Sequence, residues 1–209
     1  MQRRKRGISH LPTASGYRFD EVFSSLQKSI RRADEEGAMY WAIELEEDFN
    51  PHLWNRLEVI SHEDVGIVSM DVIMFVRTCK EQYMECKKRG SGSNRLMLSN
   101  AILALCRAEK TRLADSFNIH SYRRLASERR EIPDIAKDKH TQAGRKLGRG
   151  FDHFFTEATQ LQQPNEDNWL GADPYEESAK HKSIHNVPRV GDLKSEFNKN
   201  SSDVQDTLF

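Results

Sequence analysis

Apolar residues recur at intervals of three and four positions along much of the chain, and this period constrains the fold more than any other feature. The first such stripe consists of Phe19, Val22, Phe23, Leu26 and Ile30. Because an α-helix turns once every 3.6 residues, a stripe with this spacing lies on one helix face and needs a partner to bury it. No segment alternates apolar and polar residues for long enough to indicate a strand. The sequence therefore predicts an all-α fold.

Start signals place the next two helices. Asp34 is expected to cap a second helix, whose apolar face is Met39, Ala42, Ile43 and Leu45. Asn50-Pro51 predicts the start of a third, with Asn50 as the cap and Pro51 in the first helical position. The stripe of this third helix is Leu53, Trp54, Leu57 and Ile60.

The remaining helices are less sharply marked. Ser69 is expected to open a long fourth helix with an inward face of Val72, Ile73, Val76, Cys79 and Tyr83. Lys88–Ser93 is rich in Gly and Ser and predicts a flexible turn. A fifth helix follows from about Arg95, with Leu98, Ile102, Leu105 and Cys106 as its stripe. Ser121 is expected to cap a sixth that runs to Glu131, and Ile135–Leu147 forms a weaker one.

The two ends of the chain differ in amino-acid composition from the helical part. Residues 1–16 are basic, and residues 162–204 are polar with scattered prolines, so both are expected to be disordered. The overall charged fraction of 31% and mean hydropathy of −0.76 agree with that expectation. No apolar run approaches the roughly 18 residues of a membrane span, and no signal peptide is recognisable. A cytoplasmic protein without a membrane partner is therefore predicted.

Residues for catalysis or metal binding are not gathered in any known pattern. The three cysteines, Cys79, Cys86 and Cys106, have neither a zinc-site nor a disulfide spacing. The stretch from Gly144 to Gly150 lacks the Lys-Ser/Thr ending of a phosphate-binding loop. His62-Glu63 resembles half of a zinc-protease motif, but Gly66 stands where the second His would be required. We expect no enzyme, no metal and no cofactor.

Charge is unevenly distributed along a chain whose net charge is zero. Residues 17–86 hold 7 Lys/Arg against 15 Asp/Glu, whereas residues 87–161 hold 16 against 8. Such a division indicates an anionic partner on the basic side, self-association through opposite patches, or solvated helix faces without a further role.

Three short blocks resemble a known family when they are taken in order. They are Lys28-Ser29-Ile30-Arg31 with Asp34, then Ala38 with Tyr40-Trp41, then Ser61 with Glu63-Asp64-Val65-Gly66. They look like the C-terminal helical domain of the AAA+ ATPases called replication-associated recombination protein A or MgsA, which are related to Werner-helicase-interacting protein. The similarity continues more loosely through Asn94–Cys106 and Ile132–Gly150.

This resemblance implies a helical bundle over residues 17–161 that is similar to the clamp-loader collar and forms a homotetramer. The family's ATPase module precedes this domain, and here only sixteen residues precede Tyr17. The implied role is that of a non-enzymatic accessory protein in DNA replication, recombination or repair. The alternative is a structural or regulatory subunit that co-assembles with a full-length AAA+ recombination ATPase.

Two basic clusters are candidates for DNA binding. Phosphate contacts need Lys and Arg side chains but little sequence precision. The positions chosen are Lys87, Lys88, Arg89 and Arg95 in the first cluster, and Arg145, Lys146 and Arg149 in the second. Few aromatic residues are interleaved with these cations in the sequence, so a base-stacking groove is not indicated. We expect any binding to be sensitive to salt and indifferent to sequence.

The last five residues, 205–209, resemble the peptide by which bacterial replication and repair proteins dock on the β sliding clamp. In that pattern a Gln is followed after two residues by Leu-Phe, here Gln205, Leu208 and Phe209. The Gln side chain can both donate and accept hydrogen bonds, and the two apolar side chains can fill a cleft. A sliding clamp is therefore a predicted partner.

Overall fold

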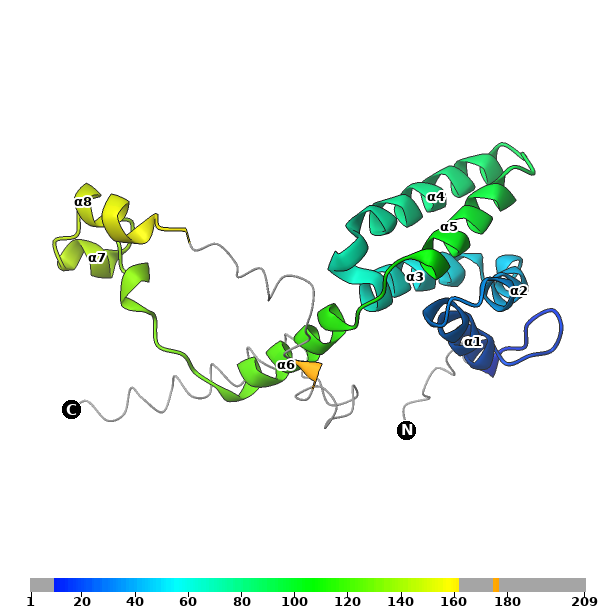
Figure 1. The fold of residues 1–209 in the computed structure, drawn as a ribbon, viewed down its shortest axis with the longest axis horizontal. Helices are drawn as coiled ribbons and strands as arrows, with labels where there is room; N and C mark the ends of the chain where they lie inside the picture. Colours follow the sequence, from blue (N-terminus) through cyan, green and yellow to red (C-terminus); the bar gives the residue numbers. More distant parts are fainter. Residues whose placement is uncertain (1–9, 162–174, 177–209) are drawn as a thin grey trace, which may run out of the picture. The chain divides into compact units, whose positions relative to one another are not determined.

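The computed structural model describes residues 10–161 and 175–176, and it divides the chain into two compact units, Met1–Asn118 and Ile119–Phe209 (Figure 1). Every regular element in the described residues is helical, apart from one isolated bridge between Pro12 and Arg18. The all-α prediction is confirmed. None of the described helices is long and apolar enough to cross a membrane.

The first unit begins with two helices, α1 (Phe19–Arg31) and α2 (Glu35–Glu46), joined by a tight turn in which Ala33 has φ +58°. The apolar stripe of α1 is buried, as predicted, except that Phe23 is only partly covered. The carboxylate of Asp34 accepts a hydrogen bond from the Gly37 backbone N–H at 2.9 Å, which is the predicted cap. Ile43 was expected on the inner face of α2, but it is 56% exposed.

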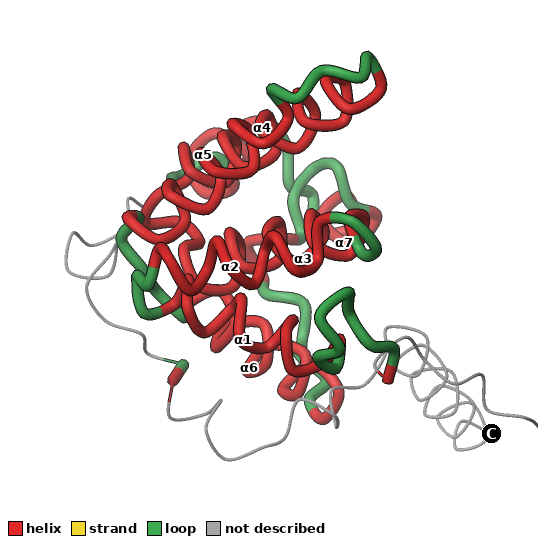
Figure 2. The backbone as a smooth tube through the Cα atoms, turned by 90° about the vertical axis from the view of Figure 1, so that its right-hand side faces the viewer, coloured by secondary structure: helices red, strands yellow, loops and turns green. Residues whose placement is uncertain are grey.

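Helix α3 (Asn50–Ile60) runs directly into a π-helical turn, Ser61–Val65, and then a 3₁₀ turn, Gly66–Ser69. The long helices α4 (Met70–Lys88) and α5 (Asn94–Arg107) follow and lie antiparallel, side by side (Figures 1 and 2). The predicted stripes of α3 and α5 are fully buried, together with Val76, Cys79 and Tyr83 of α4. Val72 and Ile73 are only half-buried, and Val72 packs against the edge of the core.

Asn50 does not cap α3 with its side chain, contrary to the sequence prediction. Phe49 occupies the cap position, and the buried Asn50 amide instead donates to the Tyr83 hydroxyl at 2.9 Å. That hydroxyl donates in turn to Glu46 Oε1 at 2.8 Å. A polar chain of three residues therefore ties α2, α3 and α4 together beside the buried Trp54 ring, and each buried polar group in it has a partner.

Helix α6 (Leu113–Ser127) begins eight residues before Ser121, which was predicted to be its cap, and it contains the boundary between the two units. The Thr111 hydroxyl accepts from the Leu113 N–H at 3.1 Å and provides the early start. The weaker helix predicted over Ile135–Leu147 is mostly irregular. A 3₁₀ turn at Asp134–Ala136 is followed only by the five-residue α7 (Gln142–Lys146), whose cap is Thr141.

The second unit ends, within the described residues, with α8 (Phe151–His153) and a π-helical turn at Phe154–Ala158. The predicted linker 162–204 and the peptide 205–209 lie outside the described residues, apart from Tyr175 and Glu176. Of the basic N-terminus, only residues 10–16 are described.

Candidate functional site

The π-helical turn carries a carboxylate that is almost completely buried. Asp64 is 1% exposed, and its two oxygens accept four hydrogen bonds. Arg31 Nε donates to Oδ1 at 2.9 Å and Arg31 Nη2 to Oδ2 at 3.3 Å. Arg112 Nη1 donates to Oδ1 at 3.0 Å, and Gln27 Nε2 donates to Oδ2 at 3.0 Å. A buried carboxylate is stable only when it is paired and hydrogen-bonded, and both conditions are met here.

The neighbouring residues extend this cluster. Glu63 Oε1 accepts from Arg112 Nη1 at 2.6 Å and from Arg31 Nη2 at 3.4 Å, and Asp115 also accepts from Arg112. Burial disfavours the charged form of Arg112, but the hydrogen bonds to Glu63 and Asp64 outweigh it, so the pKa of Arg112 is raised. The guanidinium therefore stays charged and holds the carboxylates together.

The backbone of the turn is fixed as well. Thr111 N–H donates to the Asp64 carbonyl at 3.0 Å, and the Ser61 hydroxyl donates to the Glu58 carbonyl at 2.7 Å. Gly66 has φ +62° and ψ −145°, a conformation open essentially to glycine alone. The Ser61–Gly66 block, noticed in the sequence only as a resemblance, therefore attaches the start of α6 to α1 and α3.

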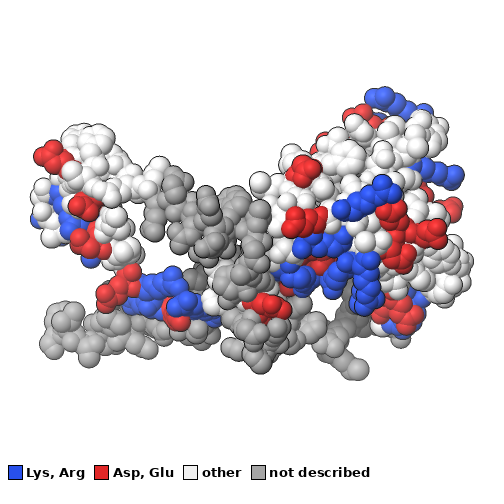
Figure 3. All heavy atoms as spheres, in the orientation of Figure 1, with Lys and Arg blue, Asp and Glu red and all other residues white. Residues whose placement is uncertain are grey.

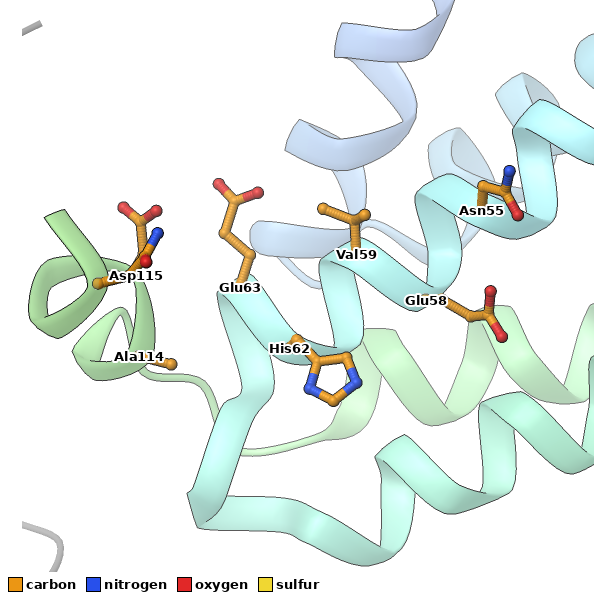
Figure 4. A pocket seen from close by; sticks show the side chains of 8 residues that line it. Asn55, Glu58, Val59, His62, Glu63, Ala114 and Asp115 are labelled. Carbon is orange, nitrogen blue, oxygen red and sulfur yellow. The ribbon is translucent and has the colours of Figure 1, made fainter. Parts of the chain in front are cut away.

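A hollow of about 530 Å³ lies beside this turn, between the end of α3 and the first turns of α6 (Figure 4). Glu63 and Asp115 point toward one side of it, whereas His62 points away from both. At its far end Lys80 Nζ donates to Glu58 at 2.6 Å and to Asn55 at 3.2 Å. The hollow holds no nucleophile with an adjacent base, and the described residues contain no group of three or more His, Cys, Asp or Glu placed to hold a metal ion.

The first predicted DNA-binding cluster is brought together at the turn between α4 and α5. Lys87, Lys88, Arg89 and Arg95 are all exposed there, and Figure 3 shows Lys and Arg side chains around this end of the unit. Arg89 is paired with Glu85 at 3.4 Å. Glu46 and Glu47 line the same hollow as Lys87 and Arg95, so part of the positive field is offset.

The second predicted cluster has two different parts. Arg145 and Lys146 are exposed on α7 and available to a ligand. The Arg149 side chain is only 19% exposed, because its guanidinium pairs with the Asp134 carboxylate. It also donates to the carbonyls of Asp134 at 2.8 Å and Lys137 at 3.0 Å. Arg149 therefore closes the loop 134–149, a role that its position in a basic run does not reveal.

Two features of the site were not anticipated from the sequence. The first is the buried position of Asp64, since an acidic residue in a polar stretch predicts exposure. The spacing of Arg31 on the polar edge of α1 gives no clue to its partner. The second is an exposed aromatic cluster at Phe151–Phe155 in the second unit. The predicted clamp-binding residues Gln205, Leu208 and Phe209 lie outside the described residues.

The fold and the site together define a helical domain in which one buried carboxylate, paired with two arginines, joins segments that are far apart in the sequence. The model of the family described as MgsA AAA+ ATPase C terminal matches residues 32–189, and the chain belongs to this family. The resemblance noted in the sequence is confirmed. The match starts inside the predicted domain and extends into the predicted linker.

A curated relative agrees with the family match. Replication-associated recombination protein A of Bacillus subtilis (strain 168) is 27% identical over 200 residues. That alignment covers 91% of this chain and 43% of the relative, so the chain spans less than half the length of that protein.

Proposed function

We propose that this chain is an accessory protein of DNA replication, recombination or repair that has no ATPase activity of its own. The observation that carries the proposal is the family match over residues 32–189, together with the name of the Bacillus subtilis relative. The 209-residue sequence contains no Gly-x-x-x-x-Gly-Lys-Ser/Thr loop, which ATP phosphates require in an enzyme of that class. Calorimetry with ATP should detect no binding, and micromolar affinity would contradict this part of the proposal.

Self-association through the helical part of the chain, residues 17–161, is the second element of the proposed function. Ile67, Met70 and Met74 follow one another at helical spacing on the outside of the first unit, and Phe75 lies beside them. They are 45%, 60%, 65% and 44% exposed, and we call this group the α4 apolar face. Exposed apolar patches of this kind are typical of protein–protein contacts. A homo-oligomer, a tetramer as in the family, is the state we propose.

DNA binding is the third element. The exposed cations Lys87, Lys88 and Arg95 of the first unit, and Arg145 and Lys146 of the second, are suited to phosphate contacts. Affinity should fall steeply with salt, because each phosphate contact releases a counterion. Arg149 is left out of the test, since its replacement would break the 134–149 loop as well as remove a charge. Equal gel shifts for the wild type and Arg145→Glu, Lys146→Glu would exclude α7 from the DNA site.

Docking on the β sliding clamp through Gln205, Leu208 and Phe209 is the fourth element. Burial of Leu208 and Phe209 in an apolar cleft is worth about 1.5–3 kcal/mol each, so truncation of either should lower affinity about tenfold or more. Gln205→Ala should leave polar groups of the cleft unpaired. The measurement is a fluorescence titration of a peptide ending at Phe209 against the clamp of the source organism. Asp206→Ala is the matched control, and equal binding by a Leu208→Ala, Phe209→Ala peptide would remove this element.

A second candidate function is that of a regulatory subunit that co-assembles with a full-length AAA+ ATPase. The family match supports it, because the model that matches residues 32–189 describes the C-terminal part of an AAA+ ATPase. Light scattering of this chain mixed with the host's ATPase distinguishes the two. A mixed assembly with altered ATP turnover supports the regulatory subunit, whereas separate homo-oligomers support the independent accessory protein.

A further inference from the structure

The second unit carries two large aromatic side chains that are mostly exposed within the described part of the chain. Phe151 is 63% exposed and Phe155 is 65% exposed. Their ring centroids are 6.2 Å apart and their planes differ by only 21°. Phe154, between them in sequence, turns inward to meet His140 edge-on at 5.1 Å. The result is a pair of near-parallel rings on one surface, which we call the aromatic pair.

One cation adjoins this pair. Lys139 Nζ lies 3.6 Å from the centroid of the Phe151 ring and 5.1 Å from that of Phe154. Exposed Arg145 and Lys146 belong to α7 of the same unit (Figure 1). Residues 119–161 hold nine Lys/Arg against six Asp/Glu. The surface therefore combines aromatic faces with positive charge, a combination that the linear sequence had not indicated.

The surface is held in shape without its own apolar core. Arg149 fixes both the Asp134 and Lys137 carbonyls, and the Thr141 hydroxyl accepts from the Gly144 N–H at 2.9 Å. A Cβ at Gly144 would lie 1.8 Å from the Asp138 carbonyl oxygen, so the loop that carries Lys139 packs closely on α7. Lys139 is therefore presented beside the aromatic pair by a closed loop, and a ligand finds the arrangement largely prepared.

The chemistry of this surface matches single-stranded DNA more closely than a protein or a duplex. Nucleobases stack on aromatic faces whatever their sequence, and the phosphates between them are bound by neighbouring Lys and Arg. A duplex offers the phosphates but keeps its base faces covered. An apolar protein surface could cover the rings, but it would have to leave Lys139 and its neighbours without a counter-charge. Charge complementarity thus favours the polyanion.

We propose that single-stranded DNA binds here, with bases stacked on Phe151 and Phe155 and phosphates held by Lys139, Arg145 and Lys146. This inference rests on the proposed DNA-binding function and assigns it a ligand form and a base-contacting site. Stacking on an aromatic side chain changes affinity by about fivefold to a hundredfold per base when the ring is removed.

The test measures fluorescence anisotropy of the full chain with three labelled ligands: an oligothymidine, an abasic oligonucleotide of equal length, and a duplex. Phe155→Ala should weaken oligothymidine binding about fivefold or more and leave the abasic and duplex ligands unchanged. Phe155→Tyr should keep the wild-type affinity, because tyrosine retains the aromatic face. Arg145→Glu with Lys146→Glu should weaken all three. Leu11→Ala, which replaces an exposed apolar residue of the first unit outside the α4 apolar face, is the matched control.

The outcomes separate this inference from the function on which it rests. Base stacking would be overturned, while DNA binding stands, if the wild type bound oligothymidine and the abasic ligand with equal affinity. The same holds if the Phe155→Ala variant bound oligothymidine as tightly as the wild type does. No binding of any ligand by the wild type would overturn DNA binding itself. A Phe155→Ala chain that loses oligomer mass in light scattering, yet binds oligothymidine normally, would show the aromatic pair to be a protein contact instead. Circular dichroism checks that each variant is folded.

Discussion

Asp64 and Arg112 meet at 3.0 Å, and through this contact one buried carboxylate connects the end of α3 to the residue that precedes α6. Arg31 of α1 approaches the same oxygen at 2.9 Å. Three parts of the chain that are far apart in sequence thus converge on one side chain. Because the carboxylate is 1% exposed while the two arginines are about 40% exposed, the acid is the member that cannot be rehydrated in place.

Replacement of Asp64 by Ala should destabilise the first unit by about 2–3 kcal/mol. The value is below that for a fully buried pair, because both guanidinium groups can still reach water. Urea unfolding followed by circular dichroism measures it. The control is Glu81→Gln, which breaks the exposed pair with Arg77 and should cost less than about 0.5 kcal/mol. Identical midpoints for the wild type and Asp64→Ala would show that the cluster contributes nothing to stability.

Gly66→Ala should cost about 1–3 kcal/mol through the backbone alone. A Cβ at this position would meet Thr111 at 3.5 Å and Ala114 at 3.9 Å, which are ordinary contacts, so the conformation and not crowding sets the cost. Gly92, in open space and without a positive φ, is the matched control and should tolerate Ala. Thermal unfolding of both variants measures this cost. A Gly66→Ala variant as stable as the Gly92→Ala variant would contradict the predicted backbone strain.

Cys106 should make the stability fall at alkaline pH. Burial raises the pKa of this thiol from its ordinary value of 9.0 to about 11. The folded state then keeps its proton where the unfolded state has lost it, so the contribution is complete below pH 9 and is lost as the pH rises toward 11. Urea midpoints of the wild type and Cys106→Ala across this range provide the measurement. The difference between them should shrink with rising pH, and a constant difference would refute the linkage.

Met74→Asp should dissociate the proposed oligomer. A charge placed in the α4 apolar face would be desolvated without a partner in the contact. Light scattering should show a smaller mass for this variant and an unchanged mass for Gln82→Asp, an exposed residue of α4 outside the face. Removal of residues 162–209 should leave the oligomer intact. A wild type that is monomeric at tens of micromolar would contradict both the proposed role of the α4 apolar face and the proposed homo-oligomer.

Helices α1 to α5 could be predicted because local signals and burial agree in them. Asp34 caps α2 as expected, and the stripes of α3 and α5 are buried without exception. Asn50 was misjudged since its amide has two possible uses, and the hydroxyl of Tyr83, 33 residues away, decides between them. Ile43 was misjudged for a different reason. Helical spacing predicts which face of a helix is buried, but it leaves the edge of that face uncertain by about one residue.

The candidate site was harder to predict because its contacts are distant in sequence. Ser121 has the form of a cap, but α6 starts earlier because Thr111 and Arg112 are held by the π-helical turn. Nothing local to Asp64 indicates that Arg31 and Arg112 will meet it. Likewise, the cations chosen for DNA binding included Arg149, whose partners at residues 134 and 137 appear only when the loop is closed. The clamp peptide remains a prediction.

Within residues 128–161, Gly144 is the one described residue that is buried, so this part of the second unit is held by hydrogen bonds, ring contacts and the Arg149 clamp. The heat-capacity change of unfolding follows the apolar surface newly exposed to water, and here most of that surface is exposed already. Melting of this segment would therefore add little to the heat-capacity step of unfolding. Hydrogen exchange of the loop amides, and not the heat-capacity step, would report whether the segment is folded.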